Sequence, residues 1–80
     1  MTEPALTPKQ LLEARKLLRW SRDRLSVRLG ISISPIASFE NSGVISKTFD
    51  IRRTREVLEA AGVEFIGENG GELGVRLRKA

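Results

Sequence analysis

Apolar residues recur three and four positions apart between residues 7 and 19, which is the spacing of one face of an α-helix. The residues on this face are Leu11, Ala14 and Leu18, with Leu12 beside them. Thr7 is suited to cap the helix, Pro8 to occupy its first turn, and Gln10 to complete a capping box. The pattern therefore predicts a first helix here, followed by Trp20, which is expected to pack into the core.

The next stretch divides into two short helices joined by a tight turn. Ser21 is expected to cap the first of them and Gly30 to end it in the left-handed conformation. A serine, Ser32 or Ser34, then begins a second helix that runs to about Asn41. The apolar residues on the facing sides of these helices and in the turn are Leu25, Leu29, Ile31, Ile36 and Phe39. They predict one small shared core.

A further helix is expected over residues 49 to 61, capped by Ser46 or Thr48 and ended by Gly62. Its rough apolar face consists of Phe49, Ile51, Val57, Leu58 and Ala61. The charged residues in its middle are expected to form a solvent-exposed face, and they are Arg52, Arg53, Arg55 and Glu56.

From residue 63 onward the apolar period changes to two, and a glycine-rich stretch separates two alternating segments, which predicts a β-hairpin. A two-residue turn would mix apolar and charged residues on one face. A three-residue loop, residues 69 to 71, is preferred because it pairs apolar residues with apolar ones and charged residues with charged ones: Phe65 with Val75, Val63 with Leu77, and Glu64 with Arg76. It also places Glu68 opposite Glu72. The hairpin is expected either to pack only on its own chain or to form a dimer interface.

These elements predict a mainly α fold: a small helix-turn-helix bundle of four or five helices with a C-terminal β-hairpin. Eighty residues are enough for one domain. Residues 1 to 62 are assigned to the helix-turn-helix part, and residues 63 to 80 to the hairpin, which belongs to the same domain and is a candidate dimer interface.

The chain has no cysteine and no histidine, which excludes Cys-His and Ser-His-Asp catalysis and the usual structural zinc sites. No enzyme activity, metal or cofactor is therefore expected. The first eight residues do not read as a signal peptide, and no apolar run approaches the ~18 residues of a membrane span. A cytoplasmic protein without membrane contact is expected.

Positive charge is concentrated in the middle of the chain. Residues 15 to 55 contain ten Lys and Arg against three Asp and Glu, a net charge of +7, and the remaining residues carry −3. A basic segment that coincides with the two short helices favours DNA as the partner, because phosphate contacts dominate affinity. A generic basic surface remains the alternative.

The segment WSRDRLSVRLGISISPIASFENSG, residues 20 to 43, resembles the helix-turn-helix of the phage repressor and Cro proteins, the XRE family of bacterial regulators. The resemblance is specific over these residues, looser over residues 7 to 62, and absent beyond residue 62. It is carried by an opening polar residue, a small residue, the glycine before the turn, an acidic-polar pair and a closing glycine: Arg22, Ser26, Gly30, Glu40 with Asn41, and Gly43.

The resemblance implies that four residues contact DNA phosphates: Arg22, Ser32, Asn41 and Lys47. Base reading is expected from exposed positions on the second helix, which are Ile33, Ser34, Ala37 and Ser38. Family members often carry Gln, Arg or Lys at these positions, whereas this chain has short or apolar side chains. They imply close docking in the groove or specificity derived from DNA shape. Alternatively, this helix reads little and the domain binds something else.

The resulting hypothesis is a homodimeric transcriptional regulator that binds a double-stranded operator with two half-sites and acts as a repressor, or as both activator and repressor. The alternative is a protein-interaction module, such as an antitoxin or antiactivator, built on the same fold. No small-molecule ligand is expected for a chain of this length.

Overall fold

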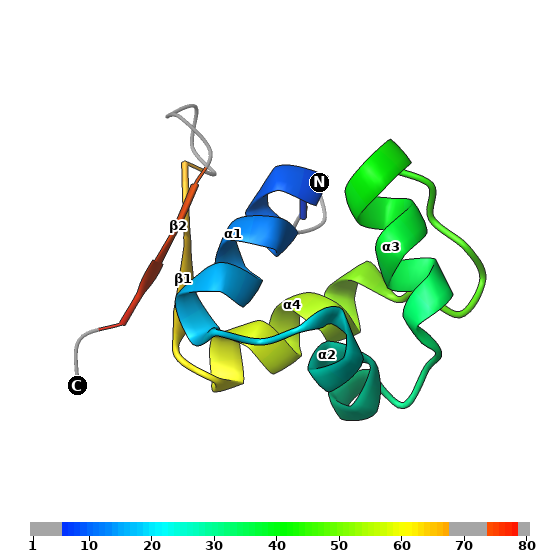
Figure 1. Ribbon diagram of the computed structural model, residues 1–80. Coiled ribbons are helices and arrows are strands. Elements are labelled where there is room, and N and C mark those ends of the chain that lie inside the picture. Colours follow the sequence, from blue (N-terminus) through cyan, green and yellow to red (C-terminus); the bar gives the residue numbers. More distant parts are fainter. Residues whose placement is uncertain (1–5, 68–73, 79–80) are drawn as a thin grey trace.

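The computed structural model describes residues 6–67 and 74–78. Within them, four helices are followed by a β-hairpin: α1 (Pro8–Leu18), α2 (Arg22–Leu29), α3 (Ile33–Ser42), α4 (Ile51–Ala60), β1 (Val63–Ile66) and β2 (Gly74–Leu77) (Figure 1). The expected mainly helical fold with a C-terminal hairpin is therefore confirmed, and the number of helices in the described ranges is four.

The caps predicted for the first two helices are present. The Thr7 hydroxyl accepts a hydrogen bond from the Gln10 N–H, and the Gln10 side chain accepts one from the Thr7 N–H, both at 3.0 Å. The Ser21 hydroxyl accepts from the N–H of Arg24. Each side chain satisfies a backbone donor that the first turn leaves without a helical partner.

The predicted start of the last helix is wrong by two residues. Asp50, rather than Ser46 or Thr48, caps α4 and accepts a hydrogen bond from the N–H of Arg53 at 3.1 Å. The N–H of Phe49 donates to the carbonyl of Ser46 in a turn, so the chain is still bending at these positions and enters the helix only after Asp50.

The core is formed by buried residues from all four helices, the loops and β1: Leu6, Leu11, Ala14, Leu25, Ile36, Phe39, Phe49, Leu58 and Val63. The rings of Phe39 and Phe49 lie 4.7 Å apart between centroids. Trp20 packs against this core, as predicted, and the Arg28 guanidinium lies over its ring at 5.1 Å. The residues of α3 that belong to this core are Ile36 and Phe39, which lie on one face of the helix.

The expectation that the middle of α4 is entirely exposed is wrong at Arg55, which is only 8% exposed. Its guanidinium lies 4.4 Å from the centroid of the Phe65 ring, and its Nε donates to Glu59 Oε2 at 3.3 Å. The aliphatic stem can be buried because the ring face and the carboxylate stabilise the charged end. Arg52, Arg53 and Glu56, which share the predicted face, are exposed as expected.

The hairpin has the predicted register. Val63 pairs with Leu77, Glu64 with Arg76, and Phe65 with Val75. α1 packs against both strands and α4 against β1, so the hairpin is part of the same compact unit as the helices. The predicted juxtaposition of Glu68 and Glu72 lies outside the described residues. Among the residues described, no helix is long and apolar enough to cross a membrane.

Candidate nucleic-acid interface

A short turn sets the angle between α2 and α3. Gly30 has a φ of 71°, and its N–H and that of Ile31 both donate to the carbonyl of Ser26, at 2.8 and 3.1 Å. A Cβ at Gly30 would meet no atom within 4 Å. Glycine is therefore favoured here by the left-handed backbone and not by lack of space.

The two helices share a buried seam. α2 packs against α3, and the buried Leu25 of α2 belongs to the same core cluster as Ile36 and Phe39 of α3. The Ser26 hydroxyl donates to the carbonyl of Asp23 at 2.6 Å, so this polar group is satisfied within its own helix. Ser26 is only 6% exposed, so this small side chain is enclosed where α2 packs in the fold.

One buried carboxylate connects three helices. Glu40, on α3, has a side chain only 2% exposed. It accepts hydrogen bonds from Nε and Nη2 of Arg15, on α1, at 2.6 and 2.8 Å, and from Nε of Arg22, on α2, at 2.7 Å. Arg15 also donates to the carbonyl of Trp20 at 2.9 Å. This network holds α3 in a defined orientation relative to α1 and α2.

The charge state of Glu40 follows from two opposing effects. Burial by itself would raise the pKa of the carboxyl, but the hydrogen bonds and positive charges of Arg15 and Arg22 together outweigh it and hold the pKa below 4.5. Glu40 is therefore ionised at neutral pH. It neutralises one of the two arginines beside α3.

Arg22 has a second partner on α3. Its Nη2 donates to Oδ1 of Asn41 at 3.2 Å, and its side chain remains 34% exposed. Two of the predicted phosphate-binding residues are thus adjacent. The role of Arg15 was not foreseen from the sequence, because it contacts a residue 25 positions away and a single sequence carries no signal for such a pair.

The outer face of α3 carries the positions predicted to read bases. Ile33, Ser34, Ser38 and Asn41 are exposed, and Ala37 is half-buried among them. Their spacing places them on one stripe of the helix, opposite the buried Ile36 and Phe39. The structure therefore brings these predicted residues together on a single surface.

The other two predicted residues flank α3, one directly before the helix and one in the loop after it. Ser32 is the exposed N-terminal cap residue, but its hydroxyl makes no capping hydrogen bond, in contrast to those of α1, α2 and α4. Lys47 is exposed in the loop that returns from α3 toward α4 (Figure 1). In the described part of the chain, Lys47 forms no hydrogen bond or ion pair.

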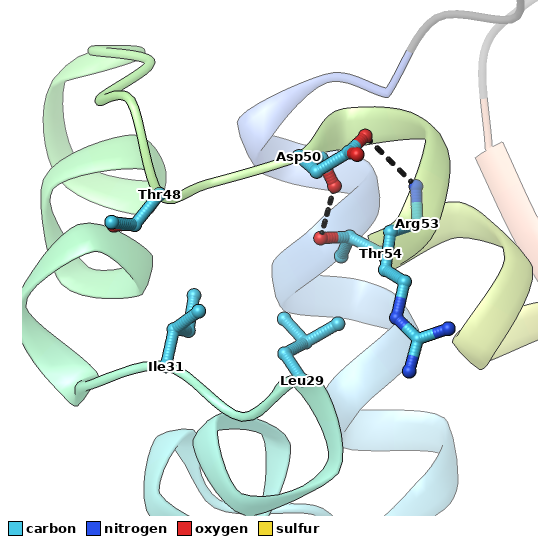
Figure 2. Close-up of a pocket in the computed structure, with 6 residues that line it drawn as sticks. All are labelled: Leu29, Ile31, Thr48, Asp50, Arg53 and Thr54. Atoms are coloured by element: carbon cyan, nitrogen blue, oxygen red, sulfur yellow. Dashed lines mark hydrogen bonds between the residues drawn. The ribbon is translucent and has the colours of Figure 1, made fainter.

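A depression of about 190 Å³ lies where the turn between α2 and α3 faces the start of α4 (Figure 2). Its apolar side is formed by Leu29 and Ile31. On its polar side, the Thr54 hydroxyl donates to the carbonyl of Asp50 at 2.8 Å. The hydrogen-bonding groups of Asp50 and Thr54 are thus used at the start of α4, and the depression is only the space where the α2–α3 turn meets α4.

No protein-family model and no curated protein matches this chain. In residues 6–67 and 74–78, no cluster of acidic side chains is arranged to hold a metal ion.

Proposed function

We propose that this protein is a homodimeric, sequence-specific DNA-binding regulator of the XRE type, which represses transcription from an operator with two half-sites or activates it where the site is suitably placed. The observation that carries the proposal is the outer face of α3, which presents small exposed side chains while Glu40 and the apolar core hold the helix from behind. A cytoplasmic location accompanies this function.

The side chains on α3 suit close approach to base edges. Ile33 is 40% exposed and offers an apolar contact to thymine methyl groups. The hydroxyls of Ser34 and Ser38 can donate to or accept from several bases. Ala37 adds almost no bulk, so the helix axis can lie deep in the major groove, which is ~12 Å wide in B-DNA.

Phosphate contacts are expected around the same face. The first N–H groups of α3 lack a side-chain cap, and a helix N-terminus attracts anions. Arg22 with Asn41 lies beside α3, and Lys47 in the loop that follows it supplies a cation with no described protein partner. These contacts would set the position of α3 on the duplex, and the base contacts would set the preferred sequence.

The proposal is tested by selecting duplexes from a random pool and measuring fluorescence anisotropy against a shuffled duplex at two salt concentrations. We expect the selected duplex to bind at least ~10³-fold more tightly, with two chains per site. Equal affinity for both duplexes would contradict sequence-specific recognition. Absence of binding to any duplex would instead support the alternative that the same fold serves as a protein-interaction module.

A further inference from the structure

The outer edge of β2 carries backbone hydrogen-bonding groups that no other described strand pairs with. The N–H of Arg78 donates to the carbonyl of Gly62 at 2.6 Å, and continuing the register by one step beyond Val63 and Leu77 sets these two residues opposite each other. In an antiparallel ladder, bonded pairs alternate with non-bonded ones, so the N–H and C=O groups of Val75 and Leu77 point away from β1. Within the described residues, β2 pairs with β1 and with no other strand.

The apolar face of the sheet continues to this edge without being covered. Leu77 lies opposite Val63 on that face, yet Leu77 is 45% exposed and Val63 only 2%. An open depression of about 330 Å³ lies between α1 and β2 and is lined by Glu13, Lys16, Leu17 and Val75. Leu17 is itself 38% exposed. The edge therefore combines free backbone groups with an uncovered apolar surface.

We propose that β2 pairs with β2 of a second copy of this chain, antiparallel, around a two-fold axis that passes between the two Arg76 residues. This register bonds Val75 to Leu77 of the partner subunit, and the reverse, through the groups that point outward. On the apolar face, Leu77 of the partner subunit then lies beside Val75, over the depression next to Leu17. The two hairpins form a four-stranded sheet with continuous apolar rows.

A second copy fits this edge because the edge is self-complementary. An exposed strand edge readily accepts another strand, and an antiparallel two-fold pairs it with itself. On the outer face the two Arg76 side chains meet, but each is bonded to Glu64 of its own chain at 2.8 Å, so the charges alternate as Glu, Arg, Arg, Glu. The Glu64 carboxylates thus offset the repulsion between the arginines.

The position of the edge also agrees with the DNA-binding surface. α1 packs against both the hairpin and α3, which lie on opposite sides of the molecule (Figure 1). Pairing through β2 leaves the outer face of α3 uncovered in both subunits. The inference rests on the proposed function for the purpose of the dimer, which is to engage two half-sites of an operator. The pairing of the strands itself does not require DNA.

The register is tested by disulfide formation in the full-length protein, which contains no natural cysteine. In the proposed dimer, Arg76→Cys places two thiols at a directly opposed pair whose Cα atoms are ~4.5–5.5 Å apart, within the range for a disulfide. We expect most of this variant to become covalently dimeric under mild oxidation. Glu64→Cys is the matched control on the same face, with thiols about three strand spacings apart, ~14 Å, and it should stay monomeric on a non-reducing gel. Equal linkage of the two variants would overturn the register.

A second pair of variants tests the edge without cysteine chemistry. Leu77→Glu introduces a charge at the proposed interface, whereas Ile66→Glu introduces it at a residue of similar exposure, 40%, on β1. Sedimentation velocity should show a dimer for the wild type and Ile66→Glu, and at least a 10-fold weaker dimer for Leu77→Glu. A monomeric wild-type chain, or equal weakening by both variants, would overturn the proposal. Because neither experiment contains DNA, a dimer that fails to bind any duplex would contradict only the proposed function.

Discussion

Glu40 is an acidic residue on the helix that we propose enters the major groove, where an exposed carboxylate would repel phosphate. Its side chain is instead buried behind α3, between Arg15 and Arg22. The ion pairs neutralise the acid and link α3 to two other helices. At the scale of single residues, Glu40 therefore positions α3 relative to the other two helices. The outward-facing surface of α3 carries no acidic side chain.

The network predicts a specific dependence of stability on pH. Since the pKa of Glu40 is lowered in the folded state, its ionised form stabilises the fold above about 4.5, its ordinary value, and this contribution is lost as the pH falls through the lower folded value. Urea unfolding from pH 7 to pH 3 should show a steeper loss of free energy for the wild type than for Glu40→Gln. At pH 7 we expect Glu40→Gln to lose about 3 kcal/mol, because it leaves two guanidinium groups without their buried counter-ion.

The exposed Glu56 provides the control for this experiment. Glu56→Gln removes the same charge from α4 at the surface and should change the free energy of unfolding by less than about 0.5 kcal/mol. Parallel pH curves for the wild type and Glu40→Gln would show that the Glu40 ion pairs do not contribute to stability.

Lys47 and Ser38 should affect DNA binding in different ways. Lys47→Ala is expected to weaken binding to selected and shuffled duplexes alike and to reduce the slope of log K against log salt by about one, since one phosphate contact is lost. Ser38→Ala should reduce the preference for the selected duplex with little change in the salt slope. Anisotropy titrations at several salt concentrations separate the two. Identical effects of both substitutions on both duplexes would contradict the division into phosphate-binding and base-reading residues.

At the scale of elements, local chemistry accounts for most of what the sequence predicted. The capping box of α1, the serine cap of α2 and the turn after it depend on residues within five positions of one another. The hairpin register follows from alternation across a short loop, and the described pairs agree with it. The start of α4 was mispredicted because Ser46, Thr48 and Asp50 are all good cap residues, and the turn that precedes the helix decides among them.

The turn between α2 and α3 offers a test at this scale. Gly30→Ala places a Cβ in open space but on left-handed backbone, so we expect a loss of about 1–2 kcal/mol in the free energy of unfolding. Gly74→Ala is the matched control, because its Cβ also meets nothing within 4 Å and its φ is not positive. Thermal and urea unfolding of both variants measure the difference. Equal stability of the two would show that the Gly30 conformation is not a constraint.

At the scale of the whole molecule, the hairpin is joined to the helices through Arg55. Its charged end lies between the Phe65 ring and Glu59, so this residue of α4 packs directly against a residue of β1. α1 then lies between the hairpin and α3 (Figure 1). This arrangement separates the proposed dimer edge from the proposed DNA surface and allows both to be used at once.

Removal of the Arg55 side chain should therefore loosen the hairpin from the helices. We expect Arg55→Ala to lower the free energy of unfolding by about 2 kcal/mol, because packing and the cation–π contact are lost. Arg53→Ala, at an exposed position on the same helix, is the control and should change the free energy of unfolding by less than about 0.5 kcal/mol. Hydrogen exchange should show faster exchange at Glu64 in the Arg55 variant. Unchanged protection there would mean that Arg55 does not hold the sheet in place.

The sequence by itself determined the type and order of the described elements, the left-handed turn at Gly30 and the pairing of the strands, because periodicity, caps and loop length act over a few residues. Only the tertiary structure decided that Glu40 meets Arg15 and Arg22, that Arg55 is buried under Phe65, and that Leu77 remains uncovered while Val63 does not. These outcomes depend on which surfaces meet when the helices pack. That packing joins residues 10 to 25 positions apart, whose pairing leaves no local pattern in a single chain.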